Sequence, residues 1–165
     1  MILIVQNIIR FILLVLVQVL VLNNIQFLGY LNPYLYILFI LALPVRLRQW
    51  IVLLLAFALG LTIDAFSNTM GLHAFATVFM AFFRLPIIKL FTTIAEGVSP
   101  TPSFRTFGIP DYLKYAVTLI LMHHTVLFFL EAFTFAYIGA LLIKILLSSL
   151  VTILLTVAVQ LLKKE

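Results

Sequence analysis

Residues 136–162, AYIGALLIKILLSSLVTILLTVAVQLL, decide the class of this fold. Lys144 is the one charged residue in the run. A helix crosses a hydrocarbon core of about 30 Å with about 20 mainly apolar residues. The run is continuous Leu, Ile and Val and lacks the period-two alternation of a membrane β-strand. We therefore expect residues 136–162 to form a transmembrane helix.

The rest of the chain has the same character. Of its 165 residues, 65% are hydrophobic and 9% are charged, and its mean hydropathy is +1.31. Soluble domains carry about 25% charged residues, so this composition excludes one. The chain has no cysteine, which excludes disulfides and thiolate metal sites. The net charge of +5 is scattered among the connections, so no nucleic-acid partner is expected.

Six hydrophobic runs predict an all-α, polytopic membrane protein with a single transmembrane domain over residues 1–165. The second and third runs are short, because about 14 residues at about 1.5 Å each reach only about 21 Å. Such segments can be partly re-entrant or thin the bilayer locally. A connection at 92–110 contains three prolines and is expected to be a cytoplasmic loop. The expected helices cover residues 2–22, 30–43, 50–66, 71–91, 111–130 and 136–162.

The basic residues predict the orientation. Short loops rich in Lys and Arg stay on the cytoplasmic side. The connections at 23–29, 67–70 and 131–135 contain neither residue, so both termini are expected to be cytoplasmic. The basic positions that fall on the cytoplasmic side are Arg46, Arg48, Lys89, Arg105, Lys114, Lys163 and Lys164.

Two of the expected helices carry polar faces. Arg10 and Gln18 share one face of the first helix, and Lys144, Ser148 and Thr152 recur every four residues on the last. Small hydroxyl side chains let helices approach and hydrogen-bond to one another, so interhelical contact is the favoured interpretation. A ligand cavity and a docking surface for another protein are the alternatives.

Further polar residues lie on the fourth and fifth helices. His123 and His124 point about 100° apart, which disfavours a shared metal ion, and no metal-binding spacing is present. Glu131 shares a face with His124, which would suit proton transfer, but interhelical hydrogen bonding is the favoured interpretation. Arg84 lies near the inner end of the fourth helix, where it is expected to extend toward the membrane surface or to contact a neighbouring helix. No catalytic constellation is recognised, and neither an enzyme activity nor a cofactor is expected.

The stretch GLTIDAFSNTMGLHAF, residues 60–75, joins the third and fourth helices. Asp64 lies at the carboxyl end of a helix, where the helix dipole disfavours an anion. It can gain hydrogen bonds from the free N–H groups at the start of the next helix. Asp64 is therefore expected to hold the turn as a clasp, with Gly60 and Gly71 permitting close approach.

The order of several motifs resembles the rod shape-determining protein MreD family. The resemblance covers nearly the whole chain, including its length and its number of spans. The stretch YLKYAVTLILMHHTVLFFLEAFTF, residues 112–135, also looks like a subgroup of that family. The other matching positions are Asn32 and Pro33, Pro44, Gly60 to Asp64, Gly71 with Leu72, and Arg84.

The resemblance implies a non-enzymatic scaffold of the bacterial cell-elongation complex, situated in the inner membrane, that pairs with MreC. Through MreC it would couple the MreB filament to peptidoglycan synthesis by RodA and a class B penicillin-binding protein. The family's fold is similar to the substrate-binding subunits of energy-coupling-factor transporters. A small-molecule, vitamin-like binding subunit of a membrane transporter is therefore the alternative.

Overall fold

The computed structural model describes residues 2–24, 32–93, 100–133 and 137–162. Within them, five helices are long and apolar enough to cross a membrane, which indicates a membrane protein. They are α1 (Ile2–Leu20), α3 (Gln49–Ser67), α4 (Leu72–Phe91), α6 (Ile109–Ala132) and α7 (Ile138–Leu162). The shorter elements are η1 (Leu22–Asn24), η2 (Leu35–Ile37), α2 (Leu38–Leu41) and α5 (Phe104–Phe107).

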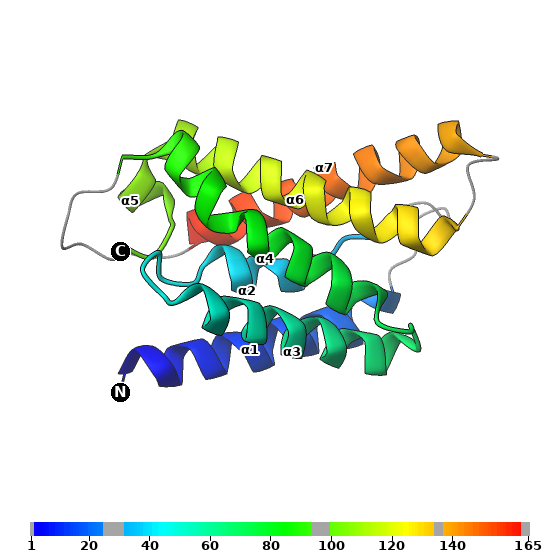
Figure 1. Cartoon of the computed structure of the whole chain (residues 1–165), viewed down its shortest axis with the longest axis horizontal. Helices are drawn as coiled ribbons and strands as arrows, with labels where there is room; N and C mark the ends of the chain where they lie inside the picture. Colours follow the sequence, from blue (N-terminus) through cyan, green and yellow to red (C-terminus); the bar gives the residue numbers. More distant parts are fainter. Residues whose placement is uncertain (1, 25–31, 94–99, 134–136, 163–165) are drawn as a thin grey trace.

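The long helices run side by side along the long axis of the molecule (Figure 1). Helix α3 packs against α1 and α4, α4 packs against α6, and α6 packs against α7. The two termini and α5 lie at one end of the molecule, and the turn between α3 and α4 lies at the other (Figure 1). We call these the terminal end and the turn end.

The expected second helix, residues 30–43, is wrong as a continuous helix. Residues 30 and 31 lie outside the described part of the chain, and the remainder forms only η2 and the single turn of α2. Every residue from 33 to 43 is buried. We call residues 32–48 the core segment, which leads through the middle of the molecule to the start of α3 (Figure 1).

The composition of residues 33–43 is compatible with burial. A stretch that is apolar on all sides has no polar face to present to water, so it suits either lipid or the interior of the bundle. Tyr36, Ile37, Ile40 and Leu43 are 0% exposed. Non-helical backbone is tolerated at membrane depth where protein surrounds it and satisfies its polar groups. The neighbouring helices therefore have to supply hydrogen-bonding side chains.

The third expected helix is longer than the sequence suggested. Helix α3 has 19 residues, which at about 1.5 Å each span about 28 Å. The other long helices begin and end within a few residues of the expected positions. The connection at 92–110 contains α5, whose N-terminal Ser103 forms a capping box with Thr106.

The outer surface of the bundle is strongly apolar. Ile8, Leu13, Leu146 and Leu154 are each more than half exposed on α1 and α7. Such a surface is suited to lipid and unsuited to water.

Basic residues gather at the terminal end. Arg46 and Arg48 precede α3, Lys89 is in the last turn of α4, and Arg105 is on α5 (Figure 1). Lys114 follows in the second turn of α6, while Lys163 and Lys164 lie outside the described residues. The structure thus groups at one end the five described residues among those from which the cytoplasmic side was predicted.

Candidate functional site

Two arginines hold carbonyl groups of the core segment. Arg84, on α4, is 2% exposed; its Nη2 donates to the carbonyl oxygen of Leu43, and its Nε donates to the Tyr115 hydroxyl at 3.2 Å. Arg10, on α1, donates from Nη1 to the carbonyl oxygen of Ala42 at 3.2 Å. The expectation that Arg84 extends toward the membrane surface is wrong, because an unpaired carbonyl in the core attracts the guanidinium inward.

Tyr115, on α6, completes this group. Its hydroxyl donates to the carbonyl oxygen of Leu41 at 3.0 Å and accepts from Arg84. Consecutive carbonyls of residues 41, 42 and 43 are thus each bonded to a different long helix. A buried carbonyl without a hydrogen-bond partner costs about 1–3 kcal/mol. These side-chain contacts therefore replace the backbone hydrogen bonds that a continuous helix would have supplied.

Two hydroxyl side chains of α7 accept hydrogen bonds from backbone N–H groups of the core segment. The Ser148 hydroxyl accepts from the backbone N–H of Asn32 at 3.1 Å. The Thr152 hydroxyl accepts from the N–H of Tyr34, also at 3.1 Å. Both hydroxyl residues are 0% exposed. Ser148 and Thr152 are four residues apart on α7, and the N–H groups that they bind are two residues apart. This spacing matches an extended backbone that lies along the helix.

Gln18 of α1 binds both a carbonyl and an N–H group of the core segment. Its side-chain oxygen accepts from the N–H of Tyr36 at 3.3 Å, and its side-chain nitrogen donates to the carbonyl oxygen of Pro33 at 3.0 Å. The residue is 0% exposed. An amide side chain can donate and accept at once, so one glutamine substitutes for two ladder bonds.

A buried histidine cluster surrounds the Tyr36 hydroxyl. This oxygen lies 3.0 Å from Nδ1 of His73, on α4, and 2.8 Å from Nε2 of His123, on α6. Thr77 is 3.4 Å away through its hydroxyl. A hydroxyl has one proton and two lone pairs, so it can connect two imidazoles of suitable tautomer. The cluster joins the core segment to α4 and α6.

The neighbouring imidazole, His124, points elsewhere. Its Nδ1 lies 2.9 Å from the carbonyl oxygen of Ile120, and its Nε2 lies 3.2 Å from the Thr152 hydroxyl. Because a carbonyl only accepts, Nδ1 is the protonated nitrogen in this contact. His123 and His124 thus bind different partners, as expected for adjacent helical positions.

Glu131 and Lys144 form an ion pair at the turn end. Their closest atoms are 2.9 Å apart, and the ammonium group of Lys144 lies 4.5 Å from the ring centroid of Phe128. Glu131 is exposed, so it does not join His124 in a buried pair. Lys144 belongs to this end and is separate from the hydroxyls that bind the core segment.

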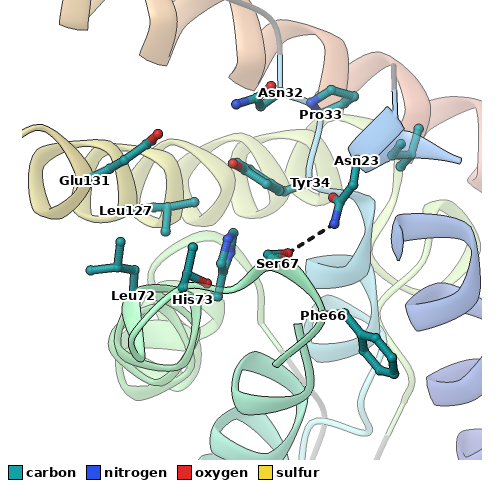
Figure 2. Close-up of a pocket in the computed structure, with 12 residues that line it drawn as sticks. Asn23, Asn32, Pro33, Tyr34, Phe66, Ser67, Leu72, His73, Leu127 and Glu131 are labelled. Carbon is teal, nitrogen blue, oxygen red and sulfur yellow. Dashed lines mark hydrogen bonds between the residues drawn. The ribbon is translucent and has the colours of Figure 1, made fainter. Parts of the chain in front are cut away.

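A pocket of about 320 Å³ opens near this ion pair at the turn end. Figure 2 shows Tyr34 and His73 facing its interior, with Glu131 on one side and Asn23 bonded to Ser67 on the other. The Asn23 to Ser67 distance is 3.1 Å. We call this space the mouth pocket, and its polar and aromatic lining is of the kind that orients small ligands.

The Asp64 carboxylate binds the start of α4. Its Oδ1 accepts from the N–H of His73 at 3.0 Å, and its Oδ2 accepts from the N–H of Ala74 at 2.9 Å. The Thr69 hydroxyl donates to Oδ1 as well. Asp64 is 2% exposed. These are the contacts expected of a turn clasp, made to the free amide groups of a helix N-terminus.

Two glycines permit this turn. A Cβ at Gly60 would meet the Ala74 Cα at 2.4 Å, so α3 and α4 cross here in backbone contact. Gly71 precedes α4 with a φ of +82°, in the left-handed region where glycine is not strained. Asn68 ends α3 in the same region with a φ of 54°.

Sequence reasoning missed Tyr36 and Tyr115 as members of the polar core. Tyr36 lies within one expected apolar run and Tyr115 near the inner end of another, and their hydroxyls bind His123 and Leu41 respectively. A tyrosine deep in an expected span is a signal, because its hydroxyl usually finds a partner when buried. Gln160 was missed in the same way, and it donates to the Tyr112 hydroxyl at 2.7 Å.

The structure brings the sequence-predicted polar residues to three places. Around the core segment lie Gln18, Arg84, Ser148 and Thr152, with Arg10. His123 contacts the same segment through the Tyr36 hydroxyl, and His124 contacts Thr152. Asp64 forms the clasp, and Glu131 and Lys144 pair at the turn end. Within the described ranges, no three His, Asp or Glu side chains are placed to hold a metal ion. Comparison with family models, curated proteins and solved structures finds no match.

Proposed function

We propose that this chain is a non-enzymatic scaffold subunit of the bacterial cell-elongation complex, situated in the inner membrane with both termini cytoplasmic. It pairs with MreC and couples MreB filaments to peptidoglycan synthesis by RodA and a class B penicillin-binding protein. The proposal starts from the ordered motif resemblance. In it, the core segment acts as the sixth crossing between α1 and α3.

The motif residues have structural roles that suit a scaffold. The carbonyl of Pro33 accepts from Gln18 within the core segment, and Arg84 binds the carbonyl of Leu43 further along it. Gly60 and Asp64 fix the crossing of α3 and α4. A protein whose polar residues hold its own backbone keeps a rigid apolar exterior, which is what a helix of a membrane partner needs in order to dock.

The single observation that carries the proposal is a groove on that exterior. It lies between α1 and α7, with α2 as its floor, and has a volume of about 520 Å³. Ile9, Leu13 and Val159 are among its walls, and Gln6 and Arg10 contribute polar groups. Grooves between helices receive a further helix by close packing, with a polar contact adding specificity.

Two tryptophan substitutions test this assignment. Ile9 lines the groove and is 51% exposed, whereas its neighbour Ile8 is 54% exposed and is not among the lining residues. Ile9→Trp should reduce recovery of MreC in mild detergent and give rounded cells. Ile8→Trp, the matched control, should keep both at the wild-type level.

Three outcomes would contradict the proposal. The first is that MreC fails to co-purify with the unaltered chain. The second is that depletion of the protein leaves rod-shaped cells. The third is that both substitutions have the same effect at equal protein levels. The first two results would remove the scaffold role, and the third would remove the groove from it.

The mouth pocket favours a second candidate, a small-molecule binding subunit of a membrane transporter. Leu72 lines this pocket, while Phe75 on the same helix is 57% exposed outside it. If a vitamin is the ligand, it should raise the melting temperature of the protein, and Leu72→Trp should abolish the shift while Phe75→Trp keeps it. Native mass spectrometry without any bound ligand, together with no shift from any vitamin, would dismiss this candidate.

A further inference from the structure

A second polar hollow lies at the terminal end, between the last residues of the core segment and the last turns of α4. Its volume is about 470 Å³. Arg46, Arg48 and Lys89 line it together with the apolar side chains Val45, Leu85 and Ile88. We call it the basic pocket.

The charge of the basic pocket is one-sided. Three cationic side chains converge on it, and no Asp or Glu is found among the described residues that line it. Like charges that share a hollow repel one another and raise the local concentration of anions. The pocket therefore favours a ligand that carries negative charge.

The pocket is fixed in shape by Gln49, the first residue of α3. Pro86 has no N–H to donate within α4, which leaves the carbonyl of Phe82 without its helical partner. The side-chain nitrogen of Gln49 lies 3.3 Å from that oxygen and 3.0 Å from the carbonyl oxygen of Ala81. This contact ties the start of α3 to α4. Arg46 and Arg48, which directly precede α3, therefore share one preformed site with Lys89 of α4.

The apolar walls identify the class of anion. Leu85 is partly exposed, and it can pack against an acyl chain but cannot stabilise a free, hydrated anion. Val45 and Ile88 are buried and form the floor of the pocket. Trp50 follows the pocket on α3 and is 57% exposed, and tryptophan is enriched at the boundary between hydrocarbon and headgroups. Basic hollows between membrane helices bind the headgroups of anionic lipids.

We infer that the basic pocket binds the phosphate headgroup of an anionic phospholipid, with Arg46, Arg48 and Lys89 around the phosphate and an acyl chain along Leu85. The inference rests on the placement of α3 and α4 in a membrane. It is independent of the elongation-complex proposal, so recovery of MreC has no bearing on it.

The test is a titration of the purified full chain with phosphatidylglycerol, followed by native mass spectrometry, with phosphatidylcholine as the neutral comparison. The double variant Arg48→Gln/Lys89→Gln should lower the affinity for phosphatidylglycerol about 25-fold, which is about fivefold for each removed charge. Affinity for phosphatidylcholine should be unchanged. Arg48→Lys, which keeps the charge, should stay within about threefold of the wild type.

A matched control removes the same charge from the same end. Arg105 is on α5 and Lys114 is on α6, and neither is among the residues that line the pocket. Arg105→Gln/Lys114→Gln should change the affinity for phosphatidylglycerol less than about threefold. An equal loss in both double variants, or no loss in either, would overturn the inference.

Two further measurements keep the test decisive if the double variant folds poorly. Raising the salt from about 0.05 to about 0.5 M should weaken binding of phosphatidylglycerol to the wild type at least about tenfold, because salt screens exposed charges; an unchanged affinity overturns the inference. Inorganic phosphate at millimolar concentration should fail to displace the lipid. Complete displacement would assign the pocket to a soluble phosphate and refute the lipid.

Discussion

The hydroxyl oxygen of Thr152, on α7, lies 3.1 Å from the backbone nitrogen of Tyr34, in the core segment. The contact joins residues far apart in the sequence and supplies a hydrogen bond that a continuous helix would have made within itself. Arg10, Gln18, Arg84 and Ser148 do the same at other positions of the segment. The polar groups inside this bundle are therefore there chiefly because the segment at its centre is not a helical span.

Thr152→Val should destabilise the protein by about 1 kcal/mol, because it leaves the N–H of Tyr34 without its acceptor at nearly unchanged volume. Thr156 is the control on the same helix. It is 1% exposed, and its hydroxyl has no hydrogen-bond partner among the described residues. Thr156→Val should be neutral or slightly stabilising in thermal unfolding in detergent. The reverse order of the two variants would refute this role for Thr152.

Arg84→Met should lower the free energy of unfolding by about 2–4 kcal/mol, because the carbonyl of Leu43 and the Tyr115 hydroxyl each lose a charged donor. Arg84→Lys should recover part of the loss, since an ammonium group still donates but lacks the planar fork. Arg105→Met, on the exposed α5, should change stability by less than about 0.5 kcal/mol. Chemical denaturation in micelles measures all three, and an Arg84→Met variant as stable as the control would contradict the proposed contact.

Asp64→Leu should destabilise the turn between α3 and α4 by about 3 kcal/mol, because the N–H groups of His73 and Ala74 lose both acceptors. Asp64→Asn should cost less, about 1 kcal/mol, since its single oxygen still serves one of these groups while its amide nitrogen cannot accept from the other. Hydrogen exchange at the first turn of α4 gives the readout. Equal and complete loss of function with normal protection of that turn would indicate a charge-dependent role beyond the clasp.

Gly60→Ala should destabilise the packing of α3 on α4 by at least about 1–3 kcal/mol, because the new methyl group meets backbone atoms of Ala74 that cannot move independently. A methyl group added at Gly139, on α7, would meet no heavy atom of another described element within 4 Å. Gly139→Ala should therefore be neutral or stabilise α7 by up to about 1 kcal/mol. Melting temperatures measured in one detergent compare the pair, and similar losses in both would exclude the close crossing at Gly60.

Part of the polar core was predictable from spacing alone. Thr152 and Ser148 lie four residues apart on α7, and Asp64 stands at the edge of a span where only the next helix offers it donors. Each prediction used neighbours in sequence and the geometry of a single helix. The partners of Thr152 and Arg84 were not predictable in this way. They are the N–H of Tyr34 and the carbonyl of Leu43, which belong to the backbone of a segment distant in sequence.

The sequence by itself determined the class: long runs of Leu, Ile, Val and Phe admit only helices in lipid, because hydrocarbon supplies no hydrogen bonds to a free backbone. It also determined which end gathers the basic residues, and that Asp64 must find donors across a turn. Only the tertiary structure decided that residues 33–43 lie in the centre of the bundle as η2 and α2. The physical reason is that an apolar stretch satisfies its composition equally well as a lipid-facing helix or as a buried segment, and the choice depends on whether other helices bring hydroxyl, amide and guanidinium groups to its backbone.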